Sequence, residues 1–334
     1  ERAGLTQLGA VIGAAPDEDK IVPAPGQLSS RGYDLEEHEG GFASEDRFGF
    51  EETAYLLLFG DLPDQAELQA FGDELAEHRV VPSRFVNDSL LRLPSRDTMN
   101  AMARVVLAMY VLDRNADDTS IRNVLWQSLL LISVFPLLAV YAYRAYRHHY
   151  QDRSLVIHSP NPDLSTAENI LHMLRRDCVY TELEAKVLDL SLVLHAEHGG
   201  GNNSSFTTHV VSSTGTDTYS AIAASLCSLK GPRHGGANIM VNRMFAELTD
   251  EVRDWENDDE LASYLRRIVD KEAFDRTGLI YGMGHPVYSV SDPRTVILRR
   301  YAEMLAEEKG LTEEFLLRRR VEELAPEVIG ERRK

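Results

Sequence analysis

Apolar residues recur three and four positions apart through most of the chain, and this spacing predicts α-helices. Two helix starts carry a capping side chain with a glutamate three residues later, at Asp64 with Glu67 and at Ser165 with Glu168. Ser95 precedes a further helical run. We therefore expect an all-α fold, with helices over residues 64–79, 95–111, 129–143, 166–176, 182–195, 218–229, 237–248, 259–269, 293–309 and 312–324.

The first fifty residues do not follow this pattern. They are rich in glycine and proline, and we expect only short extended pieces at residues 10–13 and 27–31, without sustained strand alternation. Further along, the glycines between 231 and 236 end an alanine-rich helix and mark a domain boundary. The pattern predicts a large helical domain over residues 1–234 and a small helical domain over residues 235–334.

Composition and charge exclude several classes of function. The 334 residues carry a net charge of −18, which argues against a nucleic acid as partner, although a few arginines still suffice to bind a small anion. Two cysteines and no apparent signal peptide indicate a reducing, cytoplasmic setting. The apolar run at 129–143 is short for a membrane span and contains Ser133 and Pro136. We interpret it as a buried core helix kinked at Pro136, and expect no membrane partner.

Two histidines in glycine-rich breaks between helices are the main chemical candidates. His234 lies between Gly231 and Gly236, just before a predicted helix whose free N–H groups favour a neutral imidazole. Such an imidazole can donate a hydrogen bond to a forming enolate oxygen. His285 follows Gly282-Met283-Gly284 in a second compact turn. The alternative for His234 is a loop histidine that only caps the helix.

Arg294 opens the helix that follows His285. A guanidinium can bind a carboxylate through two parallel hydrogen bonds, so this pair could orient a keto acid, with the histidine on the carbonyl and the arginine on the carboxylate. The alternative is that Asp292-Pro293-Arg294 is only a helix start with a solvated arginine.

The segment 194–205 has two histidines, His195 and His198, followed by three glycines and a polar stretch. Zinc-binding helices place their histidines four residues apart with a glutamate directly after the first, and this spacing does not match. We therefore expect no metal, and interpret the segment as a helix end followed by a polar loop that contacts substrate. The acidic segment 113–118 lacks the glycine and distal glutamate of a calcium loop.

Together these motifs resemble citrate synthase. The resemblance covers almost the whole chain in the family's order, through residues 31–34, 55–63, 194–200, 212–221, 231–238 and 282–294. It implies an all-helical fold with a large and a small domain, and a homodimer. It further implies the condensation of acetyl-CoA with oxaloacetate to citrate and CoA, with acetyl-CoA as a substrate and no separate cofactor.

The resemblance also assigns roles to single residues. His234 would hold the acetyl carbonyl and stabilise its enol, and His285 would donate to the oxaloacetate carbonyl. His198 and Arg294 would bind oxaloacetate, with Asn202 in support. The CoA site would be formed by Leu279, Ile280, Gly282, Gly284 and Arg233.

Two departures from the family pattern affect these expectations. The family's catalytic aspartate follows in a later segment, so we expect the base beyond Lys334 and the 334-residue chain alone to be inactive. Ser289 stands where many members have a basic residue near the CoA phosphate. Two alternatives stay open: a 2-methylcitrate synthase that uses propionyl-CoA, because one methylene gives little discrimination, and a non-catalytic binding protein that lacks the base.

Overall fold

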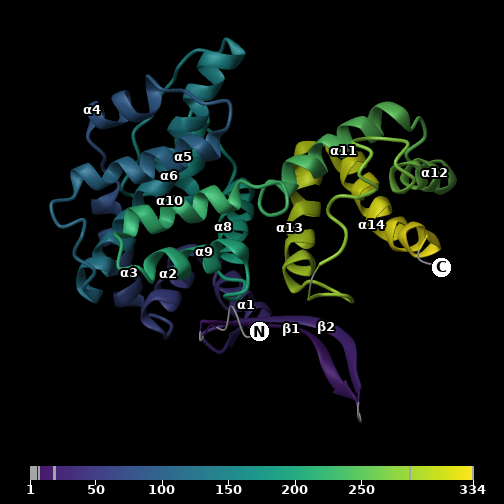
Figure 1. Cartoon of the computed structure of the whole chain (residues 1–334), viewed down its shortest axis with the longest axis horizontal. Coiled ribbons are helices and arrows are strands. Elements are labelled where there is room, and N and C mark those ends of the chain that lie inside the picture. The colour runs from purple at the N-terminus through teal and green to yellow at the C-terminus, as the bar shows by residue number, and fades with distance from the viewer. Residues whose placement is uncertain (1–5, 7, 18–19, 286, 333–334) are drawn as a thin grey trace. The chain divides into compact units, whose positions relative to one another are not determined.

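The computed structural model describes residues 6, 8–17, 20–285 and 287–332, and this part of the chain is mostly helical (Figure 1). It divides into two compact units. The first unit contains the chain up to residue 12 and residues 27–230, and the second contains residues 13–26 and the chain from residue 231. The boundary therefore lies after residue 230, four residues before the predicted one. Segment 13–26, which was predicted in the large domain, belongs to the second unit.

The N-terminal region forms a three-stranded sheet in the order β1 (Gly9–Asp17), β2 (Lys20–Ser30) and β3 (Tyr33–Asp34). The strands are longer than the predicted pieces at 10–13 and 27–31. Along most of β2, exposed residues alternate with half-buried ones. Neither face of the strand is strongly buried, so the sequence shows no alternation of apolar and polar residues. Ser30 pairs with Tyr33, and the turn between them has positive φ at Arg31 (+53°) and Gly32 (+91°), which suits a two-residue hairpin.

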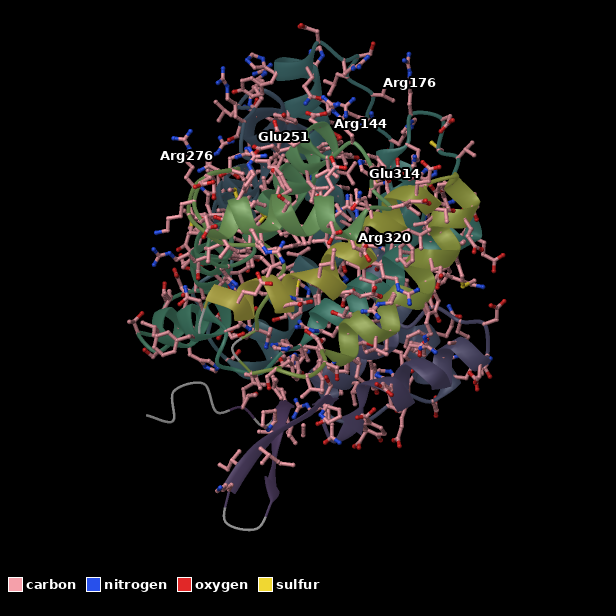
Figure 2. All side chains as sticks on the ribbon, turned by 90° about the vertical axis from the view of Figure 1, so that its right-hand side faces the viewer. Arg144, Arg176, Glu251, Arg276, Glu314 and Arg320 are labelled. Atoms are coloured by element: carbon pink, nitrogen blue, oxygen red, sulfur yellow. The ribbon has the colours of Figure 1, made fainter. Side chains whose placement is uncertain are left out.

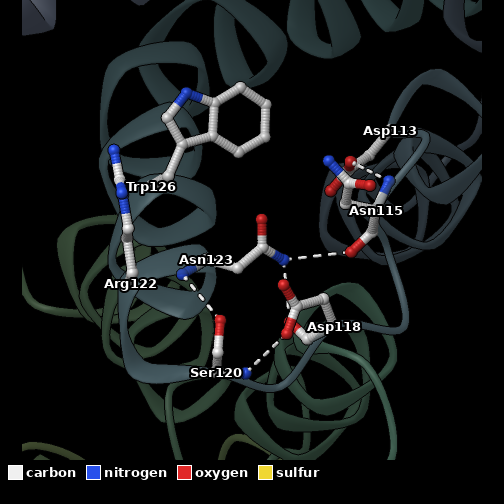
Figure 3. Close-up of a pocket in the computed structure, with 7 residues that line it drawn as sticks. All are labelled: Asp113, Asn115, Asp118, Ser120, Arg122, Asn123 and Trp126. Atoms are coloured by element: carbon white, nitrogen blue, oxygen red, sulfur yellow. Dashed lines mark hydrogen bonds between the residues drawn. The ribbon is translucent and has the colours of Figure 1, made fainter.

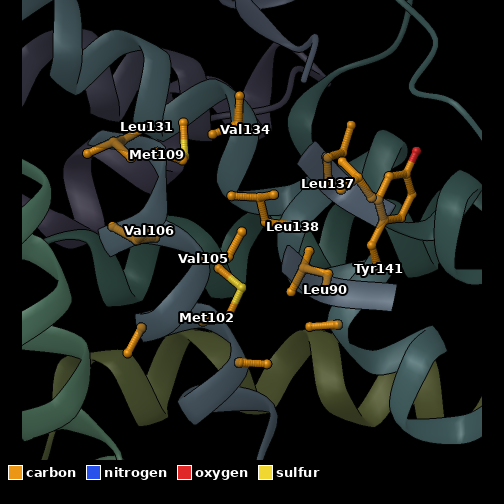
Figure 4. Packing of buried hydrophobic residues seen from close by; sticks show 14 of the residues in the cluster. Leu90, Met102, Val105, Val106, Met109, Leu131, Val134, Leu137, Leu138 and Tyr141 are labelled. Carbon is orange, nitrogen blue, oxygen red and sulfur yellow. The ribbon is translucent and has the colours of Figure 1, made fainter. Parts of the chain in front are cut away.

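Several helices of the first unit pack against one long helix. This helix, α6, spans Ile121–Gln151, and its apolar side chains join those of neighbouring helices in a buried cluster (Figure 4). The other helical elements are α1 (Leu35–Ser44), α2 (Phe50–Phe59), α3 (Gln65–His78), α4 (Ser83–Val86), η1 (Asn87–Leu91), α5 (Thr98–Ala108), η2 (Met109–Leu112), α7 (Thr166–Leu174), α8 (Glu182–Ala196), α9 (Asn203–Ser212) and α10 (Thr218–Leu229).

Helix α6 is long and apolar enough to cross a membrane by length and composition alone. Half of its most apolar window is buried inside the fold, and Val134 and Leu138 are fully enclosed by the cluster in Figure 4. Helical structure extends well beyond the predicted run at 129–143 and passes through Pro136. This packing supports the interpretation of α6 as a core helix.

Capping side chains define the helix starts. The predicted capping boxes at Asp64 with Glu67 and at Ser165 with Glu168 are both present, and a third occurs at Thr181. At α5 the capping residue is Asp97, whose carboxylate accepts from the N–H groups of Met99 and Asn100. Ser95 instead accepts a hydrogen bond from the backbone of Asp97, so the helix begins later than predicted.

The second unit has its own core. Its helices are α11 (Ala237–Glu251), α12 (Asp258–Val269), α13 (Pro293–Lys309) and α14 (Thr312–Arg332). Buried side chains from α11, α12 and α14 form one cluster, which also takes in Ile280 from the loop before α13. At the surface, Arg320, labelled in Figure 2, joins α14 to α12 through an ion pair with Asp258 at 3.0 Å. This core supports the loop that carries His285.

Candidate active site

His285 lies in the irregular segment between α12 and α13. Two glycines before it, Gly282 and Gly284, have φ of +89° and +85°, a backbone region that favours glycine. The Nδ1 atom of His285 accepts hydrogen bonds from the backbone N–H of Val287 at 3.1 Å and of Tyr288 at 3.0 Å. Because Nδ1 is the acceptor, the neutral ring carries its proton on Nε2.

The surroundings of His285 also favour the neutral ring. Burial lowers the pKa of His285 below its ordinary value of 6.5, and nearby Arg294 lowers it further, while Asp292 opposes both effects. The ring of Tyr288 stacks on the imidazole, with centroids 4.7 Å apart and an interplanar angle of 24°. His285 is therefore held as a neutral hydrogen-bond donor whose donating atom is Nε2.

Arg294 forms a bidentate pair with Asp292, the N-cap residue of α13. Its Nε lies 3.0 Å from Oδ1 and its Nη2 lies 2.6 Å from Oδ2 of this carboxylate. Burial raises the pKa of Asp292, but the hydrogen bonds and the positive charge of Arg294, with a smaller effect of His285, together outweigh burial, so the pKa lies below its ordinary value. This pair occupies the side edge of the guanidinium. A substrate carboxylate would bind at the end edge, formed by Nη1 and Nη2.

The predicted CoA-site residues 279–284 form an extended loop before His285. Leu279 is exposed, whereas the side chain of Ile280 is buried in the unit's core, so Ile280 can offer a ligand only its backbone. A side chain at Gly282 would meet Val241 of α11 at 3.4 Å, which shows that the loop passes close to the first turns of this helix. Tyr281 donates to Asp275 at 2.6 Å and so fixes the middle of the loop.

His234 lies in the tight turn that precedes α11. Its backbone N–H and that of Gly236 both donate to the carbonyl of Gly231, at 3.0 and 3.1 Å, and its carbonyl accepts from Ala237. The helix starts at Ala237, as predicted, and the imidazole is half-buried. Arg233 in the same turn is exposed. His234 and the loop at Gly282 thus both adjoin the N-terminal part of α11.

His198 and Asn202 belong to the first unit, in the segment between α8 and α9. Asn202 caps α9: its amide oxygen accepts from the N–H of Ser205 at 2.9 Å, and its amide nitrogen donates to the Gly199 carbonyl and the Ser205 hydroxyl. Glu197 accepts from the N–H of Gly199 and is committed to this turn. Asn202 therefore fixes the loop after His198, which is half-buried.

A shallow pocket elsewhere in the first unit is lined in part by the acidic segment 113–118, which lacks the calcium-loop pattern. It is lined by Asp113, Asn115, Asp118, Ser120, Arg122, Asn123 and Trp126 (Figure 3). The side chain of Asn123 donates to the carbonyls of Asn115 and Asp118, so the pocket wall is tied together by its own hydrogen bonds. Within the described ranges, no three His, Cys, Asp or Glu side chains gather as a metal site requires.

His234, Arg233, His285, Arg294 and the loop at 279–284 thus belong to the second unit, and His198 and Asn202 belong to the first. Sequence reasoning missed the stack of Tyr288 on His285 and the partnership of Arg294 with Asp292. The available signal was the short separation within each pair, three residues for His285 and Tyr288 and two residues for Asp292 and Arg294. Strands β1 and β2 also contact the segment after His285, at Gly13 with Val287 and at Gly26 with Ser291, and nothing in the sequence indicated these contacts.

Comparison with known proteins gives one consistent family. Residues 4–334 match the family model described as "Citrate synthase, C-terminal domain". A citrate synthase of Haloferax volcanii is 36% identical over 289 residues, which cover 85% of this chain and 70% of that protein. A 2-methylcitrate synthase of Shewanella oneidensis is 31% identical over 287 residues, with coverage of 85% and 68%.

Solved structures agree with the sequence comparison. The citrate synthase of Pyrobaculum aerophilum superimposes with a TM-score of 0.74 at 27% identity, over 96% of this chain and 73% of that one. The citrate synthase of Thermotoga maritima gives a TM-score of 0.70 at 25% identity, over 98% and 75%. The all-helical assignment from the sequence is confirmed, with the small N-terminal sheet as an addition.

Proposed function

Because the chain belongs to the citrate synthase family of acyltransferases, we propose that it condenses acetyl-CoA with oxaloacetate in a Claisen-type reaction. A base takes a proton from the acetyl methyl group, and the resulting enolate carbon attacks the keto carbon of oxaloacetate, whose oxygen takes up a proton. Water then hydrolyses the thioester and releases citrate and CoA. The geometry of His285 is the observation that supports this proposal most directly.

The keto carbon must become electrophilic as the new C–C bond forms. His285 meets this need because two backbone N–H groups hold Nδ1 as an acceptor and leave the proton of the neutral ring on Nε2. A neutral donor aimed at the carbonyl oxygen stabilises the negative charge that develops there. The low pKa of His285 keeps this protonation state at neutral pH.

The remaining residues divide the work of binding. Arg294 is braced by Asp292 and offers the end edge of its guanidinium to a carboxylate of oxaloacetate. His234, at the start of α11, would donate to the thioester oxygen as the enolate forms, where the helix N-terminus favours negative charge. His198 would contact oxaloacetate, supported by Asn202. Arg233 and the backbone at Leu279, Ile280, Gly282 and Gly284 would hold CoA.

We extend the proposal to a cytoplasmic homodimer. Helix α9 of the first unit buries none of its residues, and Phe206 and Val210, four positions apart, are 45% and 50% exposed. Its small polar residues Ser204 and Thr208 face Ser225 of α10 instead. An apolar stripe on the outer side of a helix is typical of a surface that a second copy covers.

The proposed reaction is tested by oxaloacetate-dependent thiol release from acetyl-CoA and from propionyl-CoA, using the complete protein. We expect release from both thioesters, with the higher kcat/KM for acetyl-CoA, and a loss of at least 100-fold in kcat for His285→Ala because the electrophilic donor is removed. His149→Ala, which changes an exposed histidine at the end of α6, is the matched control and should retain full activity.

Each other outcome points to a different function. A preference for propionyl-CoA would identify a 2-methylcitrate synthase, as the relative from Shewanella oneidensis is named. Absence of thiol release from the complete protein, with oxaloacetate binding still seen by calorimetry, would show a binding protein instead. Full activity of His285→Ala would refute the role given to this residue.

A further inference from the structure

The segment directly after His285 determines how its imidazole is held. Val287 and Tyr288 supply the two backbone N–H groups at Nδ1, and the Tyr288 ring covers one face of the imidazole. Tyr288 itself is only 5% exposed. Any displacement of residues 287–291 would therefore move both the hydrogen bonds and the stacked ring.

Strands β1 and β2, called the hairpin below, contact this segment, and β2 does so at Gly26. The backbone N–H of Gly26 donates to the carbonyl oxygen of Ser291 at 3.1 Å and lies 3.3 Å from its hydroxyl. A Cβ added at Gly26 would lie 2.3 Å from that carbonyl oxygen and 2.6 Å from Cδ1 of Tyr288. There is no space for a side chain, because the backbone of β2 itself packs on the loop.

The other strand makes a second close approach. A Cβ added at Gly13 of β1 would lie 2.3 Å from the carbonyl oxygen of Val287. Neither Gly13 nor Gly26 has a positive φ, so the backbone at these positions would tolerate alanine. Glycine is required here by packing and not by conformation, and substitution with alanine tests the packing alone.

We propose that the hairpin positions His285, with Gly13 and Gly26 as the positioning residues that allow its two strands to press on segment 287–291. The loop needs such a brace because Gly282 and Gly284 before His285 leave its backbone adaptable. The hairpin thereby sets the protonated nitrogen and the direction of the donor. The kinetic consequence rests on the proposed function, whereas the effect on the imidazole does not.

The experiment compares Gly13→Ala and Gly26→Ala with Gly330→Ala in the complete protein. Gly330 lies in α14, where an added Cβ meets nothing within 4 Å, so it is the matched control. Nitrogen-15 NMR of labelled histidine reports the tautomer and titration of His285, assigned from the signal lost in His285→Gln. We expect the wild type and the control to show the Nε2–H tautomer, with titration below pH 6.5.

In the two test variants we expect the His285 titration to move toward 6.5 and both tautomers to be populated. We expect kcat to fall at least tenfold, with KM for acetyl-CoA within twofold of the wild type, because only the donor to the keto acid is displaced. If Gly26→Ala does not fold, Gly13→Ala decides, since it presses on the loop from the other strand.

Unchanged His285 signals in folded test variants would overturn the positioning role. Altered His285 signals with unchanged kcat would support the positioning role of the hairpin but refute the catalytic role of His285. The two hypotheses are therefore tested separately. A loss of thermal stability without a change in the His285 titration would show that the glycines serve only the fold, and would also overturn the proposal.

Discussion

Burial raises the pKa of the Asp189 carboxyl to about 7, although the backbone N–H groups of Gly49 and Phe50 donate to it. The side chain lies in α8 and is only 2% exposed. The folded state therefore keeps a proton that the unfolded chain, with an Asp pKa of 3.8, releases as the pH rises. The contribution of Asp189 to the free energy of unfolding therefore falls between about pH 4 and pH 7, by up to roughly 4 kcal/mol.

Asp189→Asn should flatten this pH dependence, since the amide does not titrate. At low pH the variant should be less stable by about 1–2 kcal/mol, because its NH₂ group replaces one acceptor of a backbone N–H. Urea unfolding of the wild type and variant from pH 4.5 to 8 measures both effects, with the exposed Asp163→Asn as control. Parallel pH profiles for wild type and Asp189→Asn would refute the protonated state.

At the scale of single residues, the sequence indicated contacts between residues close together in the chain and missed contacts between residues far apart in it. Arg294 and Asp292 are two residues apart, and the helix start that joins them is visible in the chain. Gly26 and Ser291 are 265 residues apart, and no pattern near either one indicates the other. A histidine such as His285 is recognised as a chemical candidate from its residue type alone. A glycine that close packing requires cannot be told apart in the sequence from a glycine in a loop.

Among the elements, most helices were predicted from their apolar spacing, whereas α1, α2, α4 and α9 were not. Helix α1 buries the polar residues His38 and Glu39 beside Leu35 and Phe42. Its inner face is therefore not continuously apolar, and the spacing of apolar residues does not indicate a helix. Helix α9 has no buried residue, and it starts at Asn203, inside the segment 194–205 that the sequence pattern predicts as a helix end and a polar loop. Where a capping box was present, as at α3 and α7, the helix start was predicted correctly because the signal needs only local atoms.

The capping box of α7 permits a direct measurement. The hydroxyl of Ser165 accepts from the N–H of Glu168, and the carboxylate of Glu168 accepts from the N–H of Ser165 at 2.9 Å. Ser165→Ala removes one partner of an otherwise unsatisfied helix N–H and should cost about 1 kcal/mol in the free energy of unfolding. Urea denaturation measures this loss, and Ser159→Ala in the preceding exposed loop is the control. Equal midpoints for the two variants would show that the box contributes nothing.

For the whole molecule, a net charge of −18 favours repulsion between copies, so a dimer needs an attractive contact that outweighs it, such as an apolar surface. The outer side of α9, with Phe206 and Val210, is such a surface on the first unit. The polar contacts of Asn203, Ser204 and Thr208 with α10 fix the helix in place, so these apolar side chains cannot turn inward. An exposed pair at this spacing presents one continuous stripe.

Phe206→Lys should therefore convert the proposed dimer into a monomer, because a buried ammonium without a partner opposes association. Sedimentation velocity on the complete protein would show the wild type at twice the mass of one chain and the variant at one mass at equal concentration. Val80→Lys, at a valine 74% exposed in the first unit but outside α9, adds the same charge and should leave the dimer intact. A wild type that sediments as a monomer refutes the dimer, and a dimeric Phe206→Lys variant places its interface on another surface.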